Sequence, residues 1–166
     1  MKNIIKGFFK DKKNYHSYIL SAIIGVSLAM VLLQFVGLAR VSGRSMNPTY
    51  AHGDVVVVNK FNIESKCKRG DIVAISPNEK CDMFLIKRVI AVGGDTITIK
   101  DNKVILNGEV LDEDYIYEEM NKNECLEDYE VPAGEIFVMG DNRNNSGDSR
   151  VYGTFKLTYL YGIVVY

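Results

Sequence analysis

The distribution of apolar and polar positions divides the chain into two parts. From Ser17 to Ala39 the sequence SYILSAIIGVSLAMVLLQFVGLA has no charged side chain in 23 positions. About 20 apolar residues are enough for a helix to cross a hydrocarbon core of about 30 Å. We therefore predict a transmembrane helix over 17–39, between a basic segment, 1–16, and a separate domain, 40–166. A removable secretory signal is the alternative, but its apolar region is only about 7 to 15 residues long.

After Ala39 the pattern changes to short runs of β-branched and apolar residues, broken by Gly, Asn and Asp. Such runs are typical of strands, and they lie at 54–61, 71–76, 83–92, 96–100, 103–108, 135–140 and 161–166. Gly, Asn and Asp at 93–95, 101–102 and 107–108 suit hairpin turns. We expect an all-β, compact multi-stranded domain, with a short helix possible only at 112–120.

Charges on either side of the apolar run indicate its orientation. Five lysines precede it, whereas two arginines follow closely, Arg40 and Arg44. The flank richer in Lys and Arg tends to stay in the cytoplasm. The expectation is a single-pass protein of the cell membrane that contacts lipid through this helix, with a cytoplasmic N-terminus and an extracytoplasmic 40–166 domain.

Net charge and cysteines exclude several functions. The formal net charge is −1, and the segment from Glu109 to Glu130 holds ten carboxylates and one Lys. This segment reads as a solvated loop, unsuited to nucleic acid or anionic lipid. Of the three cysteines, Cys67 and Cys81 are the pair that one disulfide would most plausibly join, although sequence does not fix it. No spacing resembles a metal site, so no metal is expected.

Ser45, in GRSMNPT at 43–49, is either a turn residue or a nucleophile. A Ser hydroxyl attacks efficiently only with a base to take its proton and donors to stabilise the oxyanion. His52, oriented by Asp54 or Asp148, would complete a Ser-His-Asp arrangement. However, His52 lies in the turn-like YAHGD, and nothing in the sequence positions it for that task.

Lysine is the alternative base, because burial among apolar groups lowers its pKa toward neutrality. Lys87 lies in the middle of MFLIKRVIAV, where alternation places it on one face of a strand and Arg88 on the other. Taken alone, this stretch also fits an edge strand from which both cations extend to solvent. The loop GDNRNNSGDSRVYG, 140–153, is either a well-tied surface loop or a scaffold behind a Ser/Lys pair.

Taken together, these stretches resemble the type I signal peptidases, membrane-anchored serine proteases with a Ser/Lys dyad. The resemblance rests on the order of the motifs behind a single N-terminal span: SMNPT, GDVVVV, RGDIVAI, KRVIAVGGD and GDNRNNSGDSRVYG. It covers the anchor and nearly all of the following domain.

The resemblance implies roles for individual residues. Ser45 would be the nucleophile and Lys87 the general base, with the Ser146 hydroxyl near the lysine amine. Asp148 and Arg150 would form a supporting ion pair, and Asp141 and Arg143 match scaffold positions. A Lys in place of His as the base matches the bacterial type rather than the endoplasmic-reticulum type.

The oxyanion site departs from the family pattern. The Ser45 backbone N–H would donate one hydrogen bond, but some members have a second donor, a Ser hydroxyl, where this chain has Gly43. Asn144 replaces a common Asp, and Arg44 lies where residue identity varies.

The implied function is removal of signal peptides from secreted preproteins, with cleavage after small residues through an acyl-enzyme and without a metal or organic cofactor. Met46 and the VVVV run near the anchor suggest a lipid-dipping surface, although core packing is the more common fate of such residues. Two alternatives remain: a self-cleaving repressor protease of the SOS type, which would need a DNA-binding domain in place of the span, and a non-enzymatic anchored β-domain.

Overall fold

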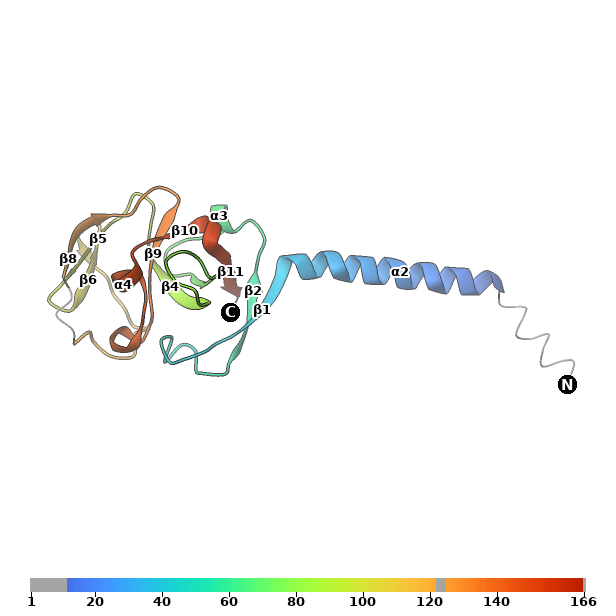
Figure 1. Cartoon of the computed structure of the whole chain (residues 1–166), viewed down its shortest axis with the longest axis horizontal. Coiled ribbons are helices and arrows are strands. Elements are labelled where there is room, and N and C mark those ends of the chain that lie inside the picture. Colours follow the sequence, from blue (N-terminus) through green and yellow to red (C-terminus); the bar gives the residue numbers. More distant parts are fainter. Residues whose placement is uncertain (1–11, 122–124, 166) are drawn as a thin grey trace, which may run out of the picture. The chain divides into compact units, whose positions relative to one another are not determined.

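The computed structural model describes residues 12–121 and 125–165, and the chain forms two units that meet between Phe35 and Val36. The first unit is helix α2, Lys12–Phe35 (Figure 1). Within it, Tyr15–Phe35 has a mean hydropathy of 2.1, and none of its residues is buried against the rest of the protein. Its 21 residues span about 32 Å as a helix, which matches the thickness of a hydrocarbon core.

The helix ends earlier than the apolar pattern predicts. The segment Val36–Ala39, assigned above to the membrane helix, belongs to strand β1, Val36–Arg40. It pairs along its whole length with β2, Val55–Asn59, in antiparallel register. Gly37 lies against Tyr161, and a Cβ on it would come within 2.9 Å of the tyrosine ring. Pairing with a strand some 20 residues away thus ends the helix, and a local apolar count does not reveal such a partner.

The second unit is mostly β, as predicted, and contains two sheets. The larger has seven strands in the order β1-β2-β11-β3-β4-β9-β10. Its remaining strands are β3 (Ile72–Ile75), β4 (Leu85–Val92), β9 (Glu135–Met139), β10 (Phe155–Lys156) and β11 (Leu160–Val165). In a flat sheet, β1 and β4 would lie about 19 Å apart at a strand spacing of about 4.8 Å. Both nevertheless line one cleft, so the sheet curls.

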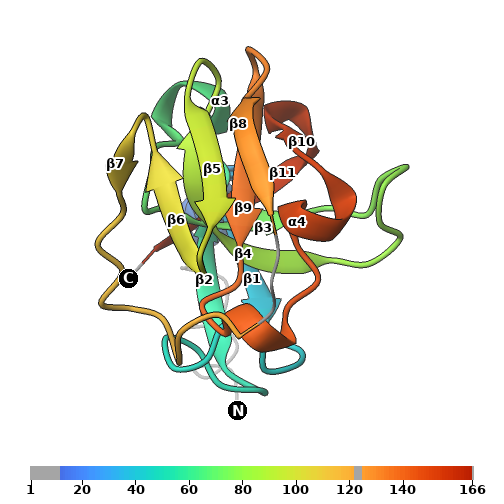
Figure 2. The same cartoon turned by 90° about the vertical axis from the view of Figure 1, so that its left-hand side faces the viewer.

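The smaller sheet has four strands in the order β7-β6-β5-β8, seen side by side in Figure 2. They are β5 (Thr96–Lys100), β6 (Lys103–Leu106), β7 (Glu109–Val110) and β8 (Leu126–Glu130). β8 lies within the acidic segment that was read as a solvated loop. It pairs with β5, and its Tyr129 packs against the core.

Short helices connect the strands: α3 (Ile63–Lys66), α4 (Ser149–Tyr152) and the 3₁₀ turns η1 (Arg143–Asn145) and η2 (Leu157–Tyr159). The possible helix at 112–120 does not form. This stretch consists of turns, bends and irregular backbone. The side chains of Glu113 and Glu118 instead accept hydrogen bonds from Arg143 and Asn144 of the 140–150 loop.

Three apolar clusters hold the unit together. One joins the small sheet to the large one through residues such as Ile97, Ile99 and Phe137. The second lies on one face of β3, β4 and β9. The third packs Met46 against Val56, Val58 and Ala74. Met46 is therefore core, and within VVVV only Val55 and Val57 face solvent. Burial of Met46 fixes the backbone next to Ser45.

Candidate active site

Ser45 and Lys87 meet in the second unit. Lys87 Nζ donates a hydrogen bond of 2.8 Å to Ser45 Oγ and one of 3.0 Å to the Ile86 carbonyl. Met46 anchors Ser45 from one side, and the Asn142 N–H donates to the Ser45 carbonyl at 2.9 Å. Lys87 is held by β4, which pairs with β3 on one side and β9 on the other. Both partners of the pair are therefore positioned by buried structure.

Lys87 is only 3% exposed. Burial lowers its pKa to about 8, and the opposing pull of the Asp148 carboxylate does not restore the usual value. A substantial fraction of this amine is thus neutral near physiological pH. Neutral amine is the form that can take a proton from the Ser45 hydroxyl.

The 140–150 loop lies behind this pair. Asp148 accepts two hydrogen bonds of 2.8 Å from Arg150 and one of 3.0 Å from the Gly140 N–H. Burial would raise the pKa of Asp148, but the hydrogen bonds and charge of Arg150 outweigh it and lower the pKa. Asp148 therefore stays ionised and links the two ends of the 140–150 loop through Gly140 and Arg150.

Ser146 lies close to the pair without a hydrogen bond to Lys87. Its Oγ is buried and has no hydrogen-bond partner among the described residues. A Cβ on Gly140 would overlap the Ser146 hydroxyl and lie 2.5 Å from the Ser45 carbonyl oxygen. The Ser146 hydroxyl and the Ser45 carbonyl therefore both pack closely against Gly140.

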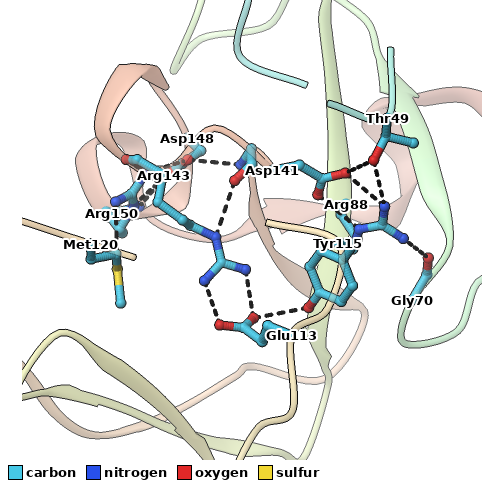
Figure 3. A network of polar contacts seen from close by, with 11 residues as sticks. Thr49, Gly70, Arg88, Glu113, Tyr115, Met120, Asp141, Arg143, Asp148 and Arg150 are labelled. Atoms are coloured by element: carbon cyan, nitrogen blue, oxygen red, sulfur yellow. Dashed lines mark hydrogen bonds and ion pairs between the residues drawn. The ribbon is translucent and has the colours of Figure 1, made fainter. Parts of the chain in front are cut away.

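A buried network extends from the loop to β4 (Figure 3). Arg88 binds Asp141 through two hydrogen bonds of 2.8 and 2.6 Å, and Thr49 donates to the same carboxylate. Arg143 binds Glu113 through bonds of 2.6 and 2.5 Å and donates to the Gly140 carbonyl at 3.1 Å.

Tyr115 connects the two ion pairs. Its ring lies 4.0 Å from the Arg88 guanidinium carbon, and its hydroxyl donates to Glu113 at 2.9 Å. Burial, with the nearby Glu113 carboxylate, raises the pKa of Tyr115, which keeps it protonated.

Sequence reasoning missed Thr49, Glu113 and Tyr115, and it gave Arg88 no role. For Arg88 a signal existed, since alternation placed it on a strand face with apolar neighbours. Glu113 was read as part of a solvated acidic loop, but its side chain is 8% exposed and pairs with Arg143. No local feature distinguishes it from the exposed carboxylates around it.

His52 does not contact Ser45 through any hydrogen bond among the described residues. Its Nδ1 accepts a 3.0 Å bond from the Gly43 N–H. Gly43 has a φ of 93°, a conformation that favours glycine over serine. The Gly43 amide is thus already paired, whereas the Ser45 N–H makes no hydrogen bond within residues 12–121 and 125–165.

The site opens into a cleft of about 830 Å³. Leu38–Arg40 of β1, the segment up to Met46, and Met83–Lys87 form much of its lining, with Tyr152 and Tyr161. In the part of the chain that the structure describes, no cluster of three or more His, Cys, Asp or Glu side chains could hold a metal.

Comparison with known proteins bears on this geometry. The sequence model of a family described as "Signal peptidase, peptidase S26" matches residues 13–166. A probable signal peptidase I-1 from Synechocystis is 39% identical over 139 residues, covering 78% of this chain and 70% of that protein. A signal peptidase I from Bacillus licheniformis is 37% identical over 151 residues, covering 84% and 81%.

A solved structure is also similar. The crystal structure of a signal peptidase I from Enterococcus faecalis aligns with a TM-score of 0.51 and 32% identity. The alignment covers 60% of this chain and 97% of that one.

Proposed function

Because this chain belongs to the signal peptidase family, peptidase S26, we propose that it cuts signal peptides from secreted preproteins with Ser45 as nucleophile and Lys87 as general base. The enzyme is a serine peptidase and thus a hydrolase. The observation that carries the residue assignment is the 2.8 Å contact between Ser45 Oγ and the buried Lys87 Nζ.

Acylation begins when the Ser45 hydroxyl attacks the scissile carbonyl carbon and neutral Lys87 takes its proton. With Lys87 neutral, the Ser45 hydroxyl donates the hydrogen bond of the 2.8 Å contact and the Lys87 nitrogen accepts it. The Ser45 N–H, which has no partner within the described residues, is available to donate to the developing oxyanion. The lysine ammonium then protonates the leaving amine as the peptide bond breaks.

Deacylation reuses the same groups. Water attacks the ester carbonyl, Lys87 accepts the water proton, and a proton returns to Ser45 Oγ as the acid product leaves. Lys87 therefore acts twice as a base and twice as an acid. No metal or organic cofactor takes part in these steps.

Substrate would bind in the extended form. β1 is an edge strand of the seven-stranded sheet and lines the cleft, so its free edge suits backbone pairing with a peptide. Leu85, Ile86 and Met46 are apolar residues that line the same cleft as Ser45. We expect small side chains to fit there before the scissile bond.

The test of the dyad is cleavage of a preprotein by the full-length protein in detergent. Ser45→Ala and Lys87→Ala should lose at least about a thousandfold in kcat/KM, as removal of a nucleophile or base does in other serine proteases. Ser65→Ala and Lys100→Ala are matched controls on exposed positions and should cleave like the wild type. Equal cleavage by all five proteins would overturn the assignment.

We also propose that Tyr15–Phe35 spans the membrane, with the N-terminus in the cytoplasm and the catalytic unit outside. Exposed Cys125 offers a test, because Cys67 and Cys81 are less accessible. A membrane-impermeant maleimide should label intact cells, and Cys125→Ser should remove the signal. If Cys125 were labelled only after lysis, the catalytic unit would lie in the cytoplasm, opposite to the proposed orientation.

A further inference from the structure

The cleft beside Ser45 carries more positive charge than the dyad requires. Three of its lining residues have basic side chains: the guanidinium groups of Arg40 and Arg44 and the partly neutral amine of Lys87. No Asp or Glu of the described residues lines the cleft. A peptide entering it therefore meets an unbalanced positive potential, which low-dielectric walls reinforce.

Arg44 differs from the buried arginines of the site. Arg88, Arg143 and Arg150 each form an ion pair with a carboxylate. The Arg44 side chain is exposed and makes no hydrogen bond or ion pair with residues 12–121 and 125–165. Because nothing in this part of the chain neutralises it, its guanidinium is available to a carboxylate from outside.

Arg40 is less available than Arg44. Its Nε donates a long hydrogen bond of 3.4 Å to the Gly53 carbonyl, which directs the side chain toward the turn before β2. We therefore expect Arg40 to contribute long-range attraction and Arg44 to make the direct contact.

The position of Arg44 limits where a substrate carboxylate must lie. Arg44 directly precedes Ser45, so their Cα atoms are about 3.8 Å apart. In an extended peptide, two residues cover about 7 Å, which a long arginine side chain can reach from this position. Only residues within about two positions of the scissile bond are therefore candidates.

We propose that Arg44 makes the enzyme prefer preproteins that carry an Asp or Glu within two residues of the scissile bond. This specificity rests on the proposed function, since it assumes cleavage at Ser45. The substrate positions that need small side chains are those that fit into the cleft. The carboxylate is at a different substrate position, where it forms a charge-assisted hydrogen bond with the Arg44 guanidinium. The contact is partly exposed, so its effect is modest and is screened by salt.

The experiment uses the full-length enzyme in a non-ionic detergent and pairs of peptides that differ by one isosteric change, Asn to Asp. The pairs place this change two residues before, one after or two after the scissile bond. For at least one pair, kcat/KM of the wild type should be about two- to fivefold higher for Asp at low salt. This ratio should approach one as salt increases.

Three variants test whether the preference for Asp comes from Arg44. Arg44→Gln should reduce the Asp/Asn ratio close to one, leaving only the weaker long-range attraction of Arg40, and Arg44→Glu should invert it. Lys103→Gln removes the same charge from an exposed position at the start of β6 and should retain the wild-type ratio. Because each ratio compares two peptides on one protein, a general loss of activity or folding does not affect it.

Several results would overturn the proposal. A wild-type ratio of one or less at every position, or a preference that is undiminished in Arg44→Gln, would exclude Arg44 as its source while leaving peptide cleavage, and thus the proposed function, intact. If Arg44→Gln instead slowed both peptides equally, and only on vesicles with anionic lipid, Arg44 would bind headgroups and not substrate. Absence of cleavage of any peptide would overturn the proposed function and this inference with it.

Discussion

Lys87 Nζ lies 2.8 Å from Ser45 Oγ, although 42 residues separate the two positions in the chain. Each is fixed by a different part of the fold: Ser45 by the buried Met46 beside it, and Lys87 by a strand in the middle of the large sheet. The contact therefore depends on the curl of that sheet and not on local sequence.

Activity should depend on the ionisation of Lys87. Since burial lowers its pKa to about 8, the amine is mostly charged below pH 8 and mostly neutral above it. Only the neutral form accepts the Ser45 proton, so kcat/KM should rise with pH, reach a plateau above about 9 and fall about tenfold per unit below 7. A profile of kcat/KM from pH 5 to 10 measures this. A flat profile would contradict the assignment of Lys87 as base.

Burial of Lys87 should also cost stability. The unfolded chain holds the lysine proton up to about pH 10.5, whereas the folded chain releases it at about 8. Between these values the unfolded state binds more protons, so stability rises with pH in this window. Well below pH 8 Lys87 is charged in both states, and the folded state bears the whole cost of burying the ammonium.

Lys87→Met should accordingly raise the free energy of unfolding by up to about 3.5 kcal/mol at pH 7, because burial lowers the pKa from 10.5 to about 8 and one pKa unit corresponds to about 1.4 kcal/mol. Its stability should also lose the rise between pH 8 and 10.5. Denaturant unfolding of the inactive variant and of Ser45→Ala at several pH values provides the comparison. A variant less stable than Ser45→Ala at pH 7 would mean that packing and the lost hydrogen bonds outweigh the charge.

The three cysteines should react as free thiols at different rates. All three are unpaired in the structure, so the disulfide suggested for Cys67 and Cys81 is not formed. Burial, with a smaller effect of Asp71, raises the pKa of Cys67 to about 11, and the thiolate is the reactive form. At pH 8 iodoacetamide should modify exposed Cys125 at least about a hundredfold faster than Cys67. Mass spectrometry of timed samples measures the rates, and a mass two units low without reductant would reveal a disulfide.

The sequence predicts strands such as β5, which alternates clearly, and β4, which is a long apolar run buried on both faces. It also places Ser45 in a loop and Lys87 in a strand, as the structure has them. It misses β1, because an apolar strand that follows an apolar helix has no visible boundary. It misses Glu113 for a different reason: in an acidic segment, one carboxylate becomes a buried partner only through Arg143, 30 residues away. Such partners are set by the curl and stacking of the sheets, which local patterns do not encode.

The Arg88–Asp141 pair should matter far more for stability than the Arg69–Asp95 pair. Asp141 is fully buried and the Arg88 side chain nearly so, whereas the Arg69 side chain is 47% exposed. Asp141→Asn leaves the buried Arg88 charge facing a neutral amide, which should cost about 3 to 5 kcal/mol. Arg69→Gln removes a half-exposed charge, and the buried Asp95 carboxylate keeps its hydrogen bonds from the Val92 N–H and Asn107, so the loss should be about 1 kcal/mol. Parallel denaturant titrations compare the two, and equal losses would contradict the role of burial.

Gly140 should be indispensable for activity. Its Cα faces the Ser146 hydroxyl and the Ser45 carbonyl so closely that a methyl group would overlap the first and lie 2.5 Å from the second. Because the carbonyl is backbone, Gly140→Ala must shift Ser45 or the loop that carries Ser146. A displacement of about 1 Å in a catalytic group can cost about a hundredfold in rate, so kcat should fall by about that factor. Gly25→Ala is the matched control, since its methyl group meets no described atom within 4 Å. Steady-state kinetics with a preprotein, alongside unfolding curves, would show whether kcat falls in protein that remains folded; wild-type kcat in Gly140→Ala would mean that the loop can yield without moving Ser45.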